Sequence, residues 1–511
     1  MKTVSQKYFA NAIYILFSKG DETMYNMTSS ADAIRQIDID SQKRRFEILC
    51  SESRYNKSGT VYFVSENGCD SADGLSPETA FRSLEHISKF NFKPGDTILF
   101  ARGETFRGQL LCHEGVTYSA YGKGPKPKIF ASKENSAFES CWSLVEGTEN
   151  IYRYTREVCD CGTAVFDSGN AHSIKEIPSY IDGKFYIRGT DIPFDFKKHI
   201  RYDLGIFCDC ASSIRTLENG RQVPDMYGGN NSGTLYLRCD KGNPGKIFSS
   251  IELSRRINAI IPKNGVTIDN LCIKYAGAHA IGGGNTENLT VRNCEIGWIG
   301  GGIQMYNPDG SATRYGNGVE IYVSCKNYTV ENCYIYEVYD AAITHQFKGN
   351  NPVPCTMKNV SYRGNLIENC VYSIEYFLDQ NDCMEQMMSD IIIENNIMRF
   401  AGYGFGTQRP DGSTPAHIKG WDHKNPAVNF VIRNNIFDRS GHMLVHTGYK
   451  NSQFKPVFSG NLYIQNEGGE LCRAGENPTR LIMFDSNARK NISDIIGDKN
   501  AEIYAIYNSE K

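Results

Sequence analysis

The sequence lacks a hydrophobic run long enough to cross a bilayer, which takes roughly 18 apolar residues. The apolar stretch near its start, residues 8–17, is short and is interrupted by Asn11. The polar Ser-Lys-Gly-Asp-Glu-Thr that follows does not supply the small residues of a secretory cleavage site. We therefore predict a helical N-terminal element, no membrane partner and a cytoplasmic location, with secretion as the alternative.

An excess of charge of one sign is also missing. The 55 Lys and Arg residues against 58 Asp and Glu residues give a net charge of −3. Such a balance offers no long-range attraction for nucleic acid or for an anionic membrane. The sequence therefore predicts no nucleic-acid partner, and it leaves homo-oligomerisation open.

Cysteine is present, but without the compact, even-numbered spacing of a small disulfide scaffold. The 17 cysteines are scattered along 511 residues, so we expect reduced thiols, as in a cytosolic protein. Two Cys-x-Cys pairs stand apart: Cys159 with Cys161, and Cys208 with Cys210. Four thiolates can hold a structural zinc ion, although the usual spacing is Cys-x2-Cys, so metal binding by this group stays open.

The sequence does contain a repeat. Six segments share one pattern of an apolar strand, a turn, a second apolar strand, a turn and a third strand of alternating character. They begin at Val266, Leu289, Tyr328, Val360, Ile391 and Asn429. A unit this small buries its apolar face only by stacking on its neighbours. The sequence therefore predicts an all-β solenoid, a parallel β-helix whose rungs lie about 4.8 Å apart.

Two columns of the repeat support this stacking. One turn position holds Asn270, Asn293, Asn332, Asn395 and Asn434. The next position holds Cys294, Cys333, Asn365, Asn396 and Asn435. Small polar side chains repeated at one turn form ladders in which each side chain hydrogen-bonds the rung above or below. We predict such a ladder here, with Cys294 and Cys333 as buried fillers and not as nucleophiles.

Three stretches of the first half carry a family resemblance: "VYFVSENGCDSADGLSPETAFRSLEHI", "FKPGDTILFARGETFRGQL" and "VTYSAYGKGPKPKI". They resemble the first rung of right-handed parallel β-helix carbohydrate-active enzymes of the pectate-lyase-like superfamily. A fourth stretch, "GTLYLRCDKGNPGKIFSSIELS", resembles the β-rich insertion that precedes the main solenoid in these enzymes. The resemblance spans roughly residues 61–465 and implies the architecture. It leaves the reaction open, because the superfamily contains hydrolases, lyases, epimerases and transferases.

We expect the chain to divide into five parts. These are a helical N-terminal cap (1–58), the first β-helix rungs (59–134), an inserted β-rich subdomain (135–255), the main β-helix (256–465) and a C-terminal cap or tail (466–511). The insertion is marked by a break in the repeat. The N-terminal cap is expected to cover an open end of the solenoid and to protect its strand edge.

The third strand of each copy supplies a candidate binding face. Aligning these strands places one apolar column toward the core: Ile303, Ile343, Ile374, Phe405 and Leu444. Because alternate residues of a strand point to opposite sides, two columns point outward: Gln304, Thr344, Glu375 and Gly406, and then Tyr306, Gln346, Phe377 and Gln408. Amides bond sugar hydroxyls and aromatic rings stack on sugar rings. We therefore predict a carbohydrate groove with Gln304, Tyr306, Gln346, Phe377, Asp379, Gln408 and Arg409 as substrate contacts.

Glycoside hydrolysis needs two carboxyl groups, about 5 Å apart for retention or about 6.5–9.5 Å apart for inversion. Asp340, in "VYDAAITHQF", shares the outward parity, and Glu375 lies in the next copy. The positions of Asp340 and Glu375 along their strands give a Cα separation of about 14 Å, which is long for either spacing. The roles of acid and nucleophile therefore stay unassigned. Glu320, in "YGNGVEIYV", is the third catalytic candidate. His345 shares the parity of the core and is expected to be buried.

Two other functions stay open beside a glycoside hydrolase, for which the loops after each third strand favour exo action. A polysaccharide lyase or uronate epimerase needs a base and positive charge, and "GTQRPDGSTPAHIKGWDH" offers Arg409, His417 and Lys419. A non-catalytic carbohydrate-binding solenoid would present the same face without turnover. We expect no cofactor, and a calcium ion held by loop carbonyls stays open.

Overall fold

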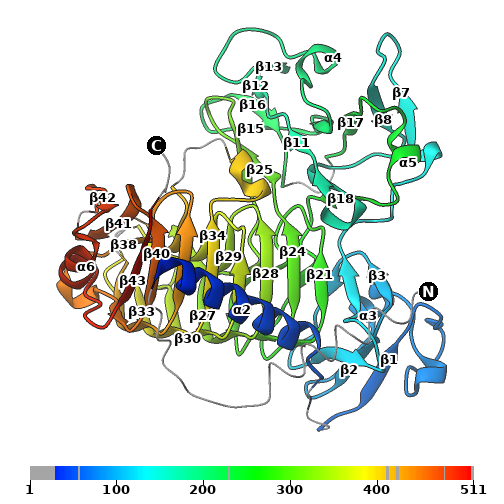
Figure 1. The fold of residues 1–511 in the computed structure, drawn as a ribbon. Helices are drawn as coiled ribbons and strands as arrows, with labels where there is room; N and C mark the ends of the chain where they lie inside the picture. The colour runs from blue at the N-terminus through cyan, green and yellow to red at the C-terminus, as the bar shows by residue number, and fades with distance from the viewer. Residues whose placement is uncertain are drawn as a thin grey trace.

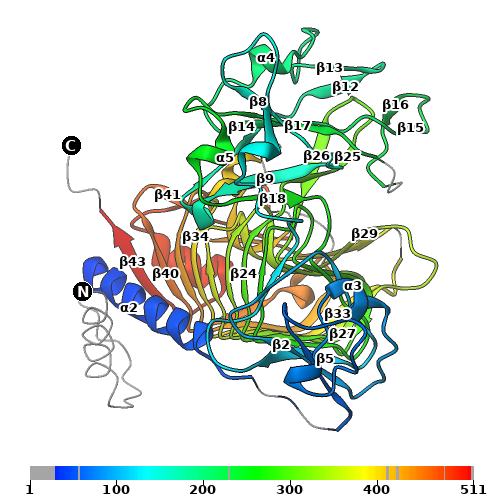
Figure 2. The same ribbon diagram turned by 90° about the vertical axis from the view of Figure 1, so that its right-hand side faces the viewer.

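The computed structural model describes residues 29–53, 55, 58–227, 231–381, 383–409, 414–421, 425–476 and 478–507. Within them the chain winds into a right-handed parallel β-helix with a smaller β-rich body on one side (Figures 1 and 2). The predicted all-β fold is confirmed. The apolar stretch at residues 8–17 lies outside the described residues, and none of the described helices is both long and apolar enough to cross a membrane.

Each full turn of the β-helix has three strands, one on each of three faces. We number the faces in the order in which the chain visits them. Face 1 carries β4 (Leu110–Leu111), β19 (Ile260–Ile261), β22 (Ile281–Glu287), the start of β27 (Val319–Glu331), β29 (Ala341–Gly349), β32 (Tyr372–Gln380), β35 (Ala416–Gly420), β38 (Val445–Gly448) and β41 (Gly469–Gly475). Neighbouring strands of this face pair in parallel.

Faces 2 and 3 are built in the same way. Face 2 carries β1 (Val61–Val64), β2 (Thr97–Ala101), β5 (Thr117–Tyr121), β20 (Thr267–Asp269), β23 (Thr290–Arg292), the rest of β27, β30 (Thr356–Arg363), β33 (Met387–Glu394), β36 (Ala427–Arg433) and β39 (Val457–Ser459). Face 3 carries β3 (Thr105–Arg107), β6 (Lys128–Phe130), β21 (Cys272–Lys274), β24 (Glu295–Ile299), β28 (Tyr334–Val338), β31 (Leu366–Glu368), β34 (Ile397–Ala401), β37 (Ile436–Ser440), β40 (Leu462–Asn466) and β43 (Glu502–Ile506).

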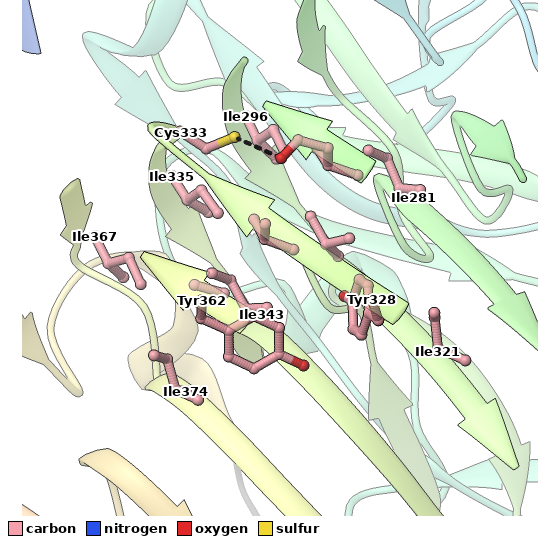
Figure 3. Close-up of a cluster of buried hydrophobic side chains, with 14 of the residues drawn as sticks. Ile281, Ile296, Ile321, Tyr328, Cys333, Ile335, Ile343, Tyr362, Ile367 and Ile374 are labelled. Carbon is pink, nitrogen blue, oxygen red and sulfur yellow. Dashed lines mark hydrogen bonds between the residues drawn. The ribbon is translucent and has the colours of Figure 1, made fainter. Parts of the chain in front are cut away.

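The core runs along the axis between the three faces (Figure 3). Ile343 and Ile374 point inward from face 1 and are fully buried. Tyr328 and Tyr362 from face 2, and Ile335 from face 3, meet them. Each fully buried aliphatic side chain of this size stabilises the fold by about 1.5–3 kcal/mol. The stacking of apolar side chains from neighbouring rungs therefore holds the β-helix together.

The predicted asparagine ladder is present. Asn365 Nδ2 donates to Asn396 Oδ1 (2.9 Å), Asn396 Nδ2 to Asn435 Oδ1 (2.9 Å), and Asn435 Nδ2 to Asn461 Oδ1 (3.0 Å). The ladder ends where Asn461 donates to Asp498 (2.8 Å). Cys294 and Cys333 continue the column as buried side chains, as expected. The preceding column of five asparagines adopts left-handed backbone, with φ between 49 and 62°, a conformation that Asn tolerates better than other residues with a Cβ.

The predicted register of face 1 is partly wrong. Ile343 pairs with Val319 on one side and with Ile374 on the other, and Ile374 pairs with Ile418. Ile303 and Phe405, placed in that column by the repeat alignment, lie outside the rungs. Leu444 is one residue out of register, because Ile418 pairs with Val445. The true outward column therefore contains Gly282, Glu320, Thr344, Glu375, Lys419 and His446.

Two excursions cause this error. Ile303 belongs to the antiparallel hairpin β25 (Gly302–Tyr306) and β26 (Ala312–Tyr315). Phe405 belongs to the 3₁₀ helix η4 (Phe405–Gln408). Both segments follow a repeat motif directly, so their sequences take the place of the next strand in an alignment, whereas the next strand of face 1 comes later in the chain.

The N-terminal helix lies along the side of the β-helix and does not cover its end. Figure 1 shows α2 (Ser30–Leu49) crossing face 3 lengthwise. Ala33 and Ile37 pack among apolar side chains that face 3 turns outward, including Ile397. Asp38 forms an ion pair with Arg399 (2.5 Å). The described part of the predicted cap, residues 29–53, therefore lies on the outside of face 3, where α2 matches an apolar row, while residues 1–28 lie outside the described residues.

The C-terminal segment packs against the last rungs. It contains β42 (Ile482–Phe484), α6 (Ala488–Asn491) and the helical turn Ile492–Ile496. Phe484, Ala488, Ile492 and Ile496 are buried in the main core. They shield the apolar interior at this end from water.

The insertion forms a second body with its own core (Figure 2). It contains β7 (Trp142–Leu144), β8 (Ile151–Tyr154), β9 (Cys161–Phe166), β10 (Ala171–His172), β11 (Ile174–Lys175), β12 (Ser179–Ile181), β13 (Lys184–Tyr186), α4 (Phe196–His199), β14 (Gly205–Asp209), β15 (Ile214–Thr216), β16 (Gln222–Pro224), β17 (Thr234–Arg238), α5 (Pro244–Ile247) and β18 (Ile251–Arg255). Ile303 and Tyr306 of the hairpin β25–β26 enter this core. The hairpin therefore links the insertion to face 1.

Candidate active site

A cavity of about 900 Å³ lies over the N-terminal half of face 1, and the hairpin β25–β26 forms part of its wall. Glycines 282–284 of β22 line it, and Tyr227 of the insertion contributes to its wall. Its polar lining includes the carboxylates Glu114, Glu320 and Asp340, the amides Asn258, Gln304, Asn317 and Gln346, and the guanidinium groups of Arg314 and Arg409. A concave, pre-formed site with convergent polar groups is typical of a small-molecule or substrate site.

Glu320 is held in the cavity wall by side-chain amides. Its Oε2 accepts hydrogen bonds from Asn317 Nδ2 and from Gln346 Nε2, the latter at 3.1 Å. Asn317 Oδ1 accepts the backbone N–H of Ala341 (2.8 Å), so one amide side chain joins Glu320 to the start of β29. His279 Nδ1 lies 3.4 Å from the same oxygen but accepts the backbone N–H of Asn317 (3.0 Å), so this nitrogen gives Glu320 no hydrogen bond.

Asp340 lies in the turn between β28 and β29 and pairs with Arg409. A guanidinium N–H of Arg409 donates to Asp340 Oδ1. The two side chains are 13% and 14% exposed, and both line the cavity. A pair this sheltered from water is stronger than a surface ion pair. The geometry therefore fixes a carboxylate and a guanidinium side by side at the cavity wall.

Glu375 is the buried carboxyl group of the site, with 4% of its surface exposed. Burial raises the pKa of Glu375 to about 8, and the negative charge of Asp340 adds to this shift. The hydrogen bond from Trp421 Nε1 to Oε1 (2.5 Å), and the charges of Arg409 and Lys419, act in the opposite direction. Glu375 is therefore neutral at pH 7. Among the described residues, Trp421 is the one hydrogen-bond partner of this carboxyl group.

The ionisation of Glu375 is expected to be visible in the fluorescence of Trp421. The indole N–H donates to the carboxyl group, so loss of the proton changes the charge next to the ring. We expect a fluorescence transition near pH 8 that is missing in Glu375→Gln. The difference between the two titrations isolates Trp421 from the other two tryptophans of the chain. Identical titrations of wild type and variant would contradict the assignment.

The raised pKa also sets the sign of a stability effect. In the unfolded chain Glu375 titrates near 4.5, and in the folded chain near 8. Between these values the folded state binds more protons, so the contribution of Glu375 to stability falls as the pH rises through this window. Urea unfolding as a function of pH should show a shallower fall in Glu375→Gln than in wild type.

Lys419 follows Glu375 in the outward column and is 1% exposed. Its Nζ lies 2.6 Å from His446 Nδ1, 3.1 Å from Thr414 Oγ1 and 4.1 Å from the ring centre of Trp421. Glu375, Lys419 and His446 do not line the cavity, whereas Asp340 and Arg409 do. Buried side chains therefore fill the C-terminal part of the column, and the open space lies on the N-terminal side of Glu375.

The helix η4 ties the insertion to Asp340. Its first backbone N–H, from Phe405, donates to Glu337 Oε2 (2.9 Å), and burial raises the pKa of Glu337 to about 7. The side chain of Gln408 accepts a hydrogen bond from the backbone N–H of Lys175 (3.0 Å) and donates one to the backbone carbonyl of Ser173 (2.8 Å). Arg409 comes next in the chain. The insertion therefore fixes the guanidinium that pairs with Asp340.

A buried ion pair supports the insertion side of this link. Lys175 Nζ donates to both oxygens of Asp160, at 2.6 and 2.8 Å, and the two side chains are 1% and 0% exposed. Asp160 also accepts the backbone N–H of Ile303 in β25 (2.7 Å). Removing one member of such a pair leaves an uncompensated buried charge and is strongly destabilising. The ion pair between Lys175 and Asp160 therefore helps to hold the insertion and β25 in place.

Replacing Gln408 with Ala is expected to loosen Arg409 from Asp340. The guanidinium charge keeps the pKa of Glu375 lower than burial alone would make it, so the fluorescence transition of Trp421 should move to higher pH. The matched control is Thr407→Ala, which removes one hydrogen bond within η4. A transition that stays in place in Gln408→Ala would show that Gln408 does not position Arg409.

Several predicted site residues meet at the cavity. Glu320, Asp340, Gln304, Gln346 and Arg409 line it. Glu375 does not line it, and its link to the cavity is the negative charge of Asp340, which raises the pKa of Glu375. Phe377 and Asp379 lie further along β32, half-buried and outside the cavity wall. Their predicted contacts with substrate stay predictions, as does that of Gln408, whose amide is engaged by the insertion.

Three further expectations have clear outcomes. Tyr306 is 2% exposed in the core of the insertion, so the prediction that it faces the groove is wrong. His345 is fully buried, as expected, with Nδ1 2.8 Å from Tyr362 OH. His417 is also fully buried, between Ser373 Oγ and the backbone carbonyl of Arg439, and burial lowers its pKa to about 4. It is therefore not an exposed base for lyase chemistry.

Sequence reasoning missed four parts of the site: Asn317, His279, Trp421 and glycines 282–284. The glycines carry a readable signal, because glycine inside a strand often marks close approach of a ligand or another backbone. The three side chains carry none, since each reaches the site from a loop or a neighbouring rung.

The four cysteines of the insertion are not grouped as metal ligands in the structure. In the described parts of the chain, no three His, Cys, Asp or Glu side chains are grouped so that they can hold a metal ion. Cys161, Cys208 and Cys210 are buried, and all four thiols, including Cys159, are unpaired. Calcium held by loop carbonyls stays a prediction.

Comparisons with solved structures find a similar course of the backbone at low sequence identity. No protein-family model matches the sequence, and no curated protein matches it. XylC in complex with xylose matches with a TM-score of 0.44 at 11% identity over 87% of this chain and 82% of that chain. GH136 lacto-N-biosidase from Eubacterium ramulus matches with a TM-score of 0.37 at 14% identity over 98% and 74%. Alginate lyase from Paenibacillus sp. matches with a TM-score of 0.34 at 11% identity over 87% and 99%.

Proposed function

We propose that the protein is a glycoside hydrolase in which Glu375 is the general acid and Glu320 the general base. The observation that carries the proposal is the neutral, buried Glu375 in the same outward column as Glu320. A buried carboxyl group with a raised pKa, in one column with a second carboxylate that accepts hydrogen bonds from amides, is typical of an acid and base pair.

The spacing of the two residues favours inversion of the anomeric carbon. Thr344 pairs with Glu320 on one side and with Glu375 on the other, so the two glutamates are two rungs apart. With rungs about 4.8 Å apart, their Cα atoms are about 9.6 Å apart. Inverting glycosidases have carboxyl groups about 6.5–9.5 Å apart, which leaves room for a water molecule. The Cα separation lies just above this range, so the two side chains have to lean toward one another to reach it.

The reaction then follows from the two roles. Glu375 gives its proton to the glycosidic oxygen as the bond from that oxygen to the anomeric carbon breaks. Glu320 takes a proton from water, whose oxygen forms the new bond to the anomeric carbon on the opposite side. Asp340 acts through Glu375, because its charge helps to keep Glu375 protonated. Asp340 as the second carboxylate in place of Glu320 is the alternative within this class.

The shape of the site supports exo action. The cavity extends on the N-terminal side of Glu375, whereas buried Lys419 and His446 fill the column on the other side. A sugar chain with its end in this cavity is cleaved near that end. The 17 cysteines are unpaired, which supports a reducing compartment such as the cytoplasm as the place of action.

A lyase is the second candidate, because Lys419 stands next to Glu375 in the column. One experiment separates the two. Neutral and uronic-acid oligosaccharides are incubated with wild type, Glu320→Gln and Glu375→Gln, and products are read as reducing ends and as absorbance of unsaturated uronates. We expect new reducing ends without absorbance, lost in both variants. Unsaturated products that persist in both variants would overturn the hydrolase.

A further inference from the structure

A glycine and a tyrosine lie beside the acid–base column. Gly284 pairs with Tyr322, and Tyr322 pairs with Gln346, so the three form the outward column two residues along the strands from Gly282 and Glu320. All of these residues line the cavity. The Gly284–Tyr322 position is therefore about 7 Å from Glu320 along the strand direction.

Gly284 directly precedes a β-bulge in β22, but the left-handed residue of that bulge is Asn285, so the bulge does not require glycine at position 284. Its φ lies outside the left-handed region, and a Cβ added to it meets no atom closer than the carbonyl oxygen of Tyr322, at 3.4 Å. In contrast, a Cβ on Gly282 or Gly283 meets side-chain atoms at 2.8 Å. Glycine in a strand costs stability relative to residues with a side chain, and it often marks close approach of a ligand. The space above Gly284 is therefore free for something other than protein.

Tyr322 is fixed but keeps part of its surface open. Its hydroxyl donates to the carbonyl of Lys348 (3.0 Å), and its ring packs edge-on against Phe347 with centroids 5.2 Å apart. The residue is nevertheless 37% exposed. An aromatic ring that is held in place at its edge and open toward a cavity binds flat apolar surfaces with little loss of side-chain entropy.

We propose that Gly284 and Tyr322 form a subsite for one pyranose ring of the substrate, with the ring lying over Gly284 and its C–H face against Tyr322. The inference rests on the proposed hydrolase and adds the residues that select and hold the sugar next to the cleaved bond. Lys263 and Asn285, which line the same cavity, are placed to bond its hydroxyls. The absent side chain at position 284 sets the depth of the subsite.

The test fills or removes the subsite and measures binding without turnover. In the Glu375→Gln background, Gly284→Trp and Tyr322→Ala are compared on an array of neutral and uronic-acid oligosaccharides. We expect each to weaken binding at least about tenfold, the size of a lost stacking contact with its buried area. Tyr322→Phe should recover binding relative to Tyr322→Ala. The control is Val428→Trp, an equally exposed strand position on face 2.

The outcomes separate the subsite from the reaction. Loss of binding in Gly284→Trp and Tyr322→Ala supports the subsite, whether or not wild type shows turnover. Absence of turnover in wild type contradicts the hydrolase but not the subsite. Hydrolysis by wild type with unchanged binding in Gly284→Trp overturns the subsite alone. Absence of binding to every oligosaccharide in both wild type and the Glu375→Gln background overturns both.

Discussion

Glu375→Gln is expected to lower kcat on oligosaccharides by roughly 10²–10⁴-fold, the contribution of a positioned general acid. The amide is close in size to the carboxyl group and is neutral like the acid it replaces, so the buried environment is kept. The variant should regain much of its rate on dinitrophenyl glycosides, whose leaving group needs no proton. The measurement is kcat on both substrates.

The matched control for this variant is Glu394→Gln. Glu394 is a partly buried glutamate of β33 on face 2 that pairs with Arg433, away from the cavity. Its replacement should leave kcat unchanged. Equal losses of kcat on both kinds of substrate in Glu375→Gln would show that the residue does not act as an acid.

Asn396→Ala is expected to destabilise the β-helix by about 3–5 kcal/mol, because it leaves several buried polar groups without partners. The Asn396 amide donates to Asn435 Oδ1 and to the carbonyl of Tyr362, and it accepts two hydrogen bonds from Asn365. The residue is fully buried, so water does not replace these bonds. The urea midpoint of unfolding measures the loss.

An exposed asparagine gives the control. Asn359 has left-handed backbone, with φ of 55°, and donates to Asn327 Oδ1 on the outside of face 2 (2.7 Å). Asn359→Gly keeps that backbone conformation available and exposes the lost bond to water, so we expect a loss below about 1 kcal/mol. Equal midpoints for the two variants would mean that the buried ladder does not hold the rungs together.

The repeat was readable from the sequence because it depends on local periodicity. Apolar positions such as Ile343 and Ile374, and the ladder through Asn396, recur with the turns of each rung. The register failed at two places, where a hairpin containing Ile303 and the helix η4 containing Phe405 intervene before the next strand. No local pattern distinguishes these excursions from a rung.

The candidate site, too, could be predicted from the sequence only in part. Glu375 and Glu320 were identified because they are acidic residues near repeat strands, but their shared column required the true pairing through Thr344. Trp421 was missed because it is 46 residues from Glu375 in the chain. Asn317 is only three residues before Glu320, but it lies before the strand, where the repeat pattern assigns it no role. The excess of outward carboxyl groups and amides was visible, whereas the protonation of Glu375 depends on burial, which only the folded chain defines.

The most direct test of the account is the anomeric configuration of the first product. Proton NMR during early hydrolysis by wild type reads this configuration before mutarotation. With Glu320 and Glu375 two rungs apart, we expect a product whose anomeric configuration is opposite to that of the substrate. Retention of configuration, or an unsaturated uronate in place of a hydrolysed sugar, would contradict it.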